Sequence, residues 1–188
     1  MKPIEKDFEK SEIVVENLHY NNQKDRKKIE IILKKEQKGF CAYTEEQITV
    51  GYEVHIEHFN PTLKGTAADS YENWFLVSAE WNLKKGTRNA DKLWEKHQPI
   101  LHPTDSSLST RLVYFDGYYF YHAEDTEAKN LIDFLHLNDQ YLVAYRQKYI
   151  KSLKELVDLG VDIKKHLQRN PIAIQFPSAI AAEFNIQL

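Results

Sequence analysis

The stretch HIEHFNP, residues 55–61, brings together His55, Glu57 and His58, three side chains suited to acid–base or metal chemistry. An imidazole with an ordinary pKa near ~6.5 is neutral at physiological pH and can accept a proton from water. A carboxylate is a hard oxygen ligand that suits Mg²⁺ or Mn²⁺. The stretch therefore predicts either an active-site strand or, in the plainer interpretation, a polar strand at the surface.

Two asparagines and several basic residues follow this stretch. Asn73 lies in YENW and Asn82 lies in EWNLKKG. An amide oxygen is also a hard ligand, so Glu57 and Asn82 can hold one divalent cation while His58 activates a water molecule. The side chains expected to contact phosphate are Lys84, Lys85, Arg88 and Lys92. The set predicts hydrolysis of a phosphodiester bond by one metal ion and one general base.

Each of these residues has a structural interpretation when it is taken alone. A Glu-His pair on a strand is usually an exposed polar pair, and a single asparagine is usually a cap or turn residue. His55 shares strand parity with Glu57, so a ligand role and a supporting structural role stay equally open for it. The order of the set along the chain favours a functional site.

The elements that must position these residues can be predicted from periodicity. Residues 25–38 predict a helix with an apolar stripe, started by Asp25 and ended by Gly39. Residues 40–60 are strand-like, and a loop runs from Pro61 to about Trp74. SAEWNLKKG predicts a short helix. The expected order in the middle of the chain is therefore strand, strand, loop and helix.

The second half of the chain predicts a hairpin and helices. Asp116-Gly117 separates two aromatic runs within residues 111–122, which is typical of a two-residue hairpin turn. Helices are expected at residues 126–136 and 139–158, and a short one from about Ser178. The apolar stripe of the 139–158 helix indicates either core packing or a docking face.

Length and composition predict one domain over residues 1–188, divided into segments 1–39, 40–96 and 97–188. The net charge of −3 neither indicates nor excludes nucleic-acid binding. The N-terminal residues have no apolar core of a signal peptide, and no apolar run reaches the ~20 residues of a membrane span. Cys41 is the single cysteine, which excludes an intrachain disulfide and a multi-cysteine metal site. We expect a cytoplasmic protein with no membrane contact.

The region from Cys41 to about Arg88 resembles the HNH endonucleases, of the His-Me finger or ββα-metal type. The motifs that carry the resemblance are CAYT, EHFNP, YEN and SAEWNLKKG. The resemblance implies an α+β fold with a ββα-metal core embedded in helices, followed by a C-terminal hairpin and helical region. It implies His58 as the general base, Glu57 and Asn82 as ligands of Mg²⁺ or Mn²⁺, and Asn73 as a residue that orients the catalytic loop or the histidine.

One departure from this family concerns its structural zinc. Many relatives hold zinc with four cysteines, and the corresponding positions here are Cys41, Thr44, Ser78 and Trp81. No structural zinc is therefore expected. Trp81 and neighbouring aromatic residues are expected to tie the two ends of the unit together instead.

A wider resemblance covers most of the chain. MKPIEK, LKKEQKGFCAY, HIEHFNP, YENW, ILHPTD, YFDGYY and LIDFLHLND together resemble the HNH subunit of the Septu anti-phage system, which also occurs as an effector with some retrons. That resemblance implies a DNA or RNA nuclease controlled by an ABC-type ATPase partner. Two alternatives stay open, namely a catalytically degenerate module that binds nucleic acid or a partner, and an HNH nuclease of a mobile element.

Overall fold

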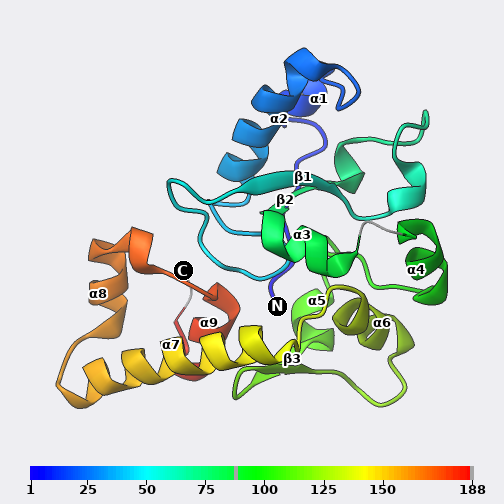
Figure 1. Cartoon of the computed structure of the whole chain (residues 1–188). Helices are drawn as coiled ribbons and strands as arrows, with labels where there is room; N and C mark the ends of the chain where they lie inside the picture. Colours follow the sequence, from blue (N-terminus) through cyan, green and yellow to red (C-terminus); the bar gives the residue numbers. More distant parts are fainter. Residues whose placement is uncertain (87–88, 187–188) are drawn as a thin grey trace.

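Two short antiparallel strands and the helix that follows them form the middle of the structure (Figure 1). The computed structural model describes residues 1–86 and 89–186. Strand β1 (Val54–His58) pairs with β2 (Trp74–Ser78), with His58 opposite Trp74. Helix α3 (Ala79–Lys85) begins directly after β2, because the Ser78 hydroxyl accepts a hydrogen bond from the Trp81 amide at 3.1 Å. The prediction of a mixed α+β fold is confirmed.

The expected pair of strands within residues 40–60 was wrong. Only β1 forms there, and its partner β2 lies after the loop that carries the 3-10 turns η1 (Pro61–Leu63) and η2 (Tyr71–Asn73). Residues before β1 turn instead of extending, with one isolated bridge between Phe40 and Gln47. Every residue of β2 is buried, so its apolar run lacks the alternation that marks a half-buried strand.

The N-terminal helices lie beside the sheet formed by β1 and β2. Helix α1 (Glu12–Val15) precedes α2 (Gln23–Glu36), which is the predicted helix shifted by two residues. The shift arises because Asn22, rather than Asp25, caps the helix by accepting a hydrogen bond from the Lys24 amide at 3.2 Å. The predicted apolar stripe of α2 is buried and faces β1 and β2.

The C-terminal half contains one hairpin among helices. The elements are α4 (Ala90–Lys96), α5 (Leu108–Arg111), β3 (Val113–Phe115), β4 (Tyr118–Phe120), α6 (Thr126–Phe134), α7 (Gln140–Asp158), α8 (Ile163–Arg169), η3 (Pro171–Ala173) and α9 (Pro177–Phe184). The predicted hairpin is confirmed, and both turn residues have positive φ, +44° at Asp116 and +85° at Gly117. A Cβ on Gly117 would lie 2.7 Å from Gln147 of α7, so the turn sits directly on that helix.

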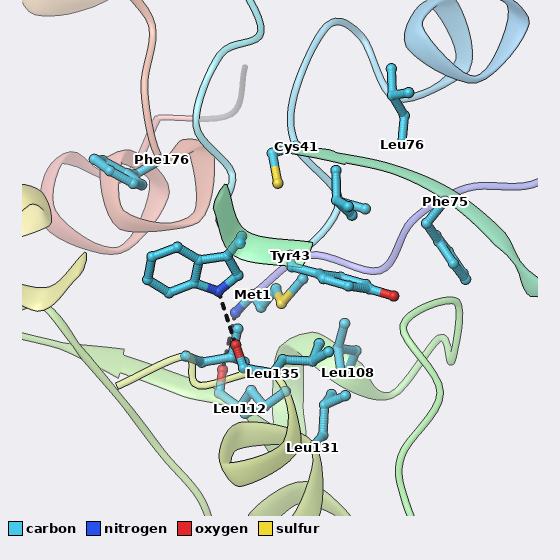
Figure 2. Close-up of a cluster of buried hydrophobic side chains, with 14 of the residues drawn as sticks. Met1, Cys41, Tyr43, Phe75, Leu76, Leu108, Leu112, Leu131, Leu135 and Phe176 are labelled. Atoms are coloured by element: carbon cyan, nitrogen blue, oxygen red, sulfur yellow. Dashed lines mark hydrogen bonds between the residues drawn. The ribbon is translucent and has the colours of Figure 1, made fainter. Parts of the chain in front are cut away.

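A continuous set of buried side chains runs from Met1 to Ile180. In Figure 2, Cys41, Tyr43 and Phe75 from the middle of the chain lie above Leu131 and Leu135 of the C-terminal half. The β1–β2–α3 unit therefore shares its core with the later helices. Among the described residues, no helix combines the length and apolar character needed to cross a membrane.

Candidate functional site

The candidate residues of β1 divide between the two faces of the strand. His55 and Glu57 share one face and contact α3, whereas His58 leaves the opposite face and contacts the loop between β1 and β2. The structure thus brings the sequence-predicted residues into two groups. The histidine group contains His58 and Asn73, and the α3 group contains Glu57, His55 and Asn82.

His58 faces a buried carboxylate that the sequence did not predict. Its Nε2 lies 3.0 Å from Oδ2 of Asp69, and the two side chains are 3% and 2% exposed. The distance between the two atoms is that of a hydrogen bond, but their alignment is not. The Nε2 atom is also sealed from solvent. Asp69 accepts further hydrogen bonds at Oδ1 from Trp74 Nε1 at 2.7 Å and Asn73 Nδ2 at 3.2 Å. The carboxylate is therefore fixed in place beside the imidazole.

Asn73 connects the two ends of the loop that follows β1. Its Oδ1 accepts from the Asn60 amide at 2.7 Å, and its Nδ2 donates to the Asn60 carbonyl at 3.0 Å as well as to Asp69. These contacts hold the residues just after His58 against the start of β2. Asn73 is therefore placed to hold both the loop and the carboxylate beside His58.

Tyr20, from the segment between α1 and α2, covers His58. The two rings meet edge to face with centroids 4.5 Å apart, and the Arg26 guanidinium lies over the Tyr20 ring, 4.6 Å from its centroid. A cleft of about 360 Å³ beside this contact is lined by Tyr20, Asp69 and Trp74, among others. Burial lowers the pKa of His58, and the nearby Asp69 carboxylate opposes that effect. A neutral imidazole is therefore favoured.

Lys85 occupies the other face of the strand end. Its ammonium contacts Oε1 of Glu57 and donates to the carbonyls of His58 at 3.0 Å and Phe59 at 3.2 Å. The Lys85 side chain is 3% exposed, and burial lowers the pKa of its ammonium while Glu57 opposes that effect. Lys85 thus ties α3 to the end of β1, which differs from the solvent-facing position expected for a phosphate contact.

His55 and Asn82 lie in direct contact. Asn82 Nδ2 lies 3.0 Å from His55 Nδ1, while Nε2 of the same ring lies 3.7 Å from the exposed Glu53 carboxylate. The Asn82 amide uses its nitrogen in this contact and not its oxygen. His55 therefore supports Asn82 directly, which is the structural role that the sequence had left open for it.

The donor types of the α3 group fit one hard divalent cation. Mg²⁺ is commonly held by one or two protein oxygens together with water, which the Glu57 carboxylate and the Asn82 amide oxygen can supply. The Lys85 ammonium already holds Oε1 of Glu57, so a cation would compete with it there. Across residues 1–86 and 89–186, no three His, Cys, Asp or Glu side chains group together as a metal site.

The predicted phosphate contacts are scattered. Lys84 pairs with Asp139 at 3.3 Å and stacks on the Trp81 ring at 4.2 Å. Lys92 lies exposed on α4 rather than on α3. Arg88 falls outside the described residues. The basic residues therefore form no single contact surface within the part of the chain that the structure describes.

Three of the four positions compared above with the zinc-binding cysteines of HNH endonucleases, Cys41, Ser78 and Trp81, are joined by hydrogen bonds. Cys41 Sγ accepts from the Ser78 amide at 3.4 Å, and the Ser78 hydroxyl accepts from the Trp81 amide. The Trp81 indole donates to the Leu135 carbonyl at 3.0 Å (Figure 2). Hydrogen bonds and packing therefore connect this corner of the fold, and Trp81 extends the connection to the C-terminal half.

Asp69 is the residue of the site that sequence reasoning missed. It stands in a loop without periodicity, and no spacing relates it to His58. The available signal was indirect, since a buried indole N–H and a buried amide nearby both need an acceptor. No family model, curated protein or solved structure was found to match the chain, so the site is interpreted from its geometry and from the motif resemblance alone.

Proposed function

We propose that the chain is a metal-dependent HNH endonuclease with a ββα-metal core, which hydrolyses phosphodiester bonds of nucleic acid, most simply DNA. The observation that carries the proposal is the buried contact between His58 and Asp69 at 3.0 Å, at the end of the first strand of a strand–loop–strand–helix unit. A histidine held by a carboxylate is a recurring arrangement for a general base. The motif order along β1, the loop and α3 supports the same assignment.

In this proposal the neutral His58 imidazole removes a proton from water. The water oxygen attacks phosphorus, the bond from phosphorus to the leaving oxygen breaks, and that oxygen takes a proton from solvent. Glu57 and Asn82 would hold the divalent cation, which would supply positive charge for the phosphate oxygens. Because Glu57 and His58 leave opposite faces of β1, the end of this strand would have to turn as the cation binds, so that one phosphate meets both groups. Lys85 would hold Glu57 until the cation competes for the carboxylate, and His55 would orient the Asn82 amide.

The cover over His58 supports control by a partner. A substrate phosphate reaches the imidazole only when Tyr20 moves, because the His58 side chain is 3% exposed. An isolated chain is then inactive or weakly active, as suits a nuclease that would otherwise damage its own cell. We accordingly place the chain in the cytoplasm as the nuclease effector of an anti-phage defence system, with an ABC-type ATPase as the controlling partner.

The test is a cleavage assay with plasmid DNA and Mg²⁺ or Mn²⁺, with and without a candidate ATPase. Wild type is compared with His58→Ala and with the control His122→Ala, which alters an exposed histidine. Cleavage by wild type and the control, lost in His58→Ala, is the expected result. Equal cleavage by wild type and His58→Ala would remove His58 from the mechanism.

A second candidate is a degenerate HNH module that binds nucleic acid or a partner without cutting. The buried His58 and the occupied Glu57 carboxylate favour it. DNA retention with no cleavage under any metal or partner condition would support this candidate. For an active enzyme, an adjacent ATPase gene favours the defence role over a mobile-element nuclease.

A further inference from the structure

The Asp69 carboxylate is held from both sides. Oδ1 accepts hydrogen bonds from Trp74 and Asn73, as described above. Oδ2 accepts from the Gly65 amide at 3.4 Å and lies 3.0 Å from His58 Nε2. With one oxygen fixed by two donors, the second oxygen has little freedom to turn away from the imidazole.

The hydrogen-bond donors of Trp74 and Asn73 need an acceptor here, but they do not need a charged one. A neutral carbonyl would satisfy the Trp74 indole and the Asn73 amide without the cost of burying an acid. The feature that a carboxylate adds is a charged acceptor 3.0 Å from Nε2, which would repel a nitrogen lone pair there even though the two atoms are not aligned as a hydrogen bond. Such an acceptor favours the imidazole tautomer with the proton on Nε2, which leaves the lone pair on Nδ1.

The ring plane is constrained as well. The Tyr20 ring meets the imidazole at an interplanar angle of 84°, so rotation of the His58 ring about its Cβ–Cγ bond would push against the tyrosine. Asp69 therefore acts on the proton position, and Tyr20 acts on the ring orientation. Only the carboxylate distinguishes one ring nitrogen from the other.

We propose that Asp69 is a positioning residue that fixes His58 in the Nε2–H tautomer and thereby makes Nδ1 the proton-accepting atom. The assignment of Nδ1 to catalysis rests on the proposed nuclease function, whereas the tautomer itself does not. The two can therefore be tested separately on the same protein.

The tautomer is measured by ¹⁵N NMR of the full chain labelled at histidine, with His58→Gln used to assign the His58 signals. Wild type is expected to show Nε2–H at His58. In Asp69→Asn, the amide oxygen can keep the Trp74 and Asn73 donors while its nitrogen points at Nε2, so the signal should change to the Nδ1–H form. The control Asp105→Asn alters a carboxylate that contacts Ser107 and should leave His58 unchanged.

Nδ1–H at His58 in the folded wild type would overturn the proposal, and so would an unchanged tautomer in folded Asp69→Asn. If Asp69→Asn does not fold, the tautomer of His58 in wild type is the test, because Nδ1–H there would overturn the proposal. Where wild type cleaves DNA, Asp69→Asn should lower kcat at least about 100-fold with little change in KM, as loss of an orienting carboxylate does in other enzymes. A confirmed tautomer in a chain that never cleaves would refute the nuclease function and leave the positioning role intact.

Discussion

At the scale of single residues, the site depends on two titratable side chains withdrawn from solvent, each beside a carboxylate. His58 lies against Asp69, and Lys85 lies against Glu57. Burial lowers the pKa of both His58 and Lys85, which favours their neutral forms, and the carboxylates oppose that effect. Because of these opposing effects, each pair can be probed by measuring the unfolding free energy as well as the activity.

The first prediction concerns pH. The pKa of His58 in the folded chain lies below its usual value of 6.5, so the unfolded chain binds the extra proton more readily. The stabilisation is therefore present above pH 6.5 and is lost as the pH falls below it. Urea unfolding between pH 8 and pH 5 should show a steeper loss of unfolding free energy in wild type than in His58→Gln. Parallel curves would contradict the prediction.

The second prediction concerns the buried pair of Lys85 and Glu57. Lys85→Met leaves the Glu57 carboxylate without its cation and should lower the unfolding free energy by about 3 kcal/mol. The double variant Lys85→Met/Glu57→Gln should cost less than the two single variants together, by at least about 1 kcal/mol. As a control, charge removal at the solvent-facing Lys129–Asp133 pair should change the unfolding free energy far less than Lys85→Met does. Additive costs at the buried pair would rule out the coupling.

At the scale of elements, the segment between α1 and α2 determines whether His58 is reachable. Tyr20 of this segment packs edge to face on the imidazole, and the Arg26 guanidinium of α2 lies over the tyrosine ring. Tyr20 also lines the cleft of about 360 Å³ beside this contact. Tyr20 is therefore the side chain to test as the cover of His58.

The third prediction is that Tyr20→Ala exposes His58. Diethyl pyrocarbonate should modify His58 at least several-fold faster in this variant than in wild type, as measured by mass spectrometry of the digested protein. Tyr20→Phe keeps the ring and should keep the protection, and the exposed His122 should react equally in all three proteins. Unchanged modification of His58 in Tyr20→Ala would show that the tyrosine is not the cover.

The fourth prediction concerns the corner that corresponds to the zinc site of many HNH endonucleases in the motif comparison. Cys41, Ser78 and Trp81 are joined there by hydrogen bonds, and Trp81 is anchored to Leu135. Because these contacts need no metal, EDTA should leave the melting temperature unchanged within about 1 °C. A fall of several degrees, reversed by added zinc, would show that a metal stabilises the fold.

At the scale of the whole molecule, Glu45 links distant parts of the chain. Its buried carboxylate accepts from the Ser178 hydroxyl and amide of α9, from the Tyr119 hydroxyl of β4 at 3.2 Å, and from the Lys2 amide at 3.4 Å. Residues near both ends of the chain therefore meet at one side chain beside the β1–β2–α3 unit.

The fifth prediction is that Glu45→Ala destabilises the entire fold. Three donors lose their acceptor at a buried position, while the Lys2 amide keeps its hydrogen bond to the Ser178 hydroxyl, so the unfolding free energy should fall by about 2–4 kcal/mol in urea. Glu53→Ala alters a carboxylate that is 82% exposed and should change stability by less than about 0.5 kcal/mol. A similar small effect in both variants would contradict the linking role of Glu45.

Local sequence rules predicted the parts of the fold that depend on neighbouring residues. The α2 helix, the Asp116-Gly117 hairpin and the α3 helix after Ser78 follow from periodicity, turn chemistry and capping. The same rules misplaced the second strand, because β2 is buried along its whole length and shows no alternation. They also gave no indication of the short helices α1, α4, α5 and α8.

By itself, the sequence determined which chemistry the chain can offer, because side-chain type and order along the chain fix the available donors, acceptors and ligands. His58, Glu57, Asn73 and Asn82 were predicted as site residues from their types, their order and the HNH resemblance. Only the tertiary structure decided which of them meet. Strand pairing placed His58 and Glu57 on opposite faces, and loop closure brought Asp69 to one while α3 brought Lys85 to the other. These contacts join residues from separate elements, and no local pattern encodes them.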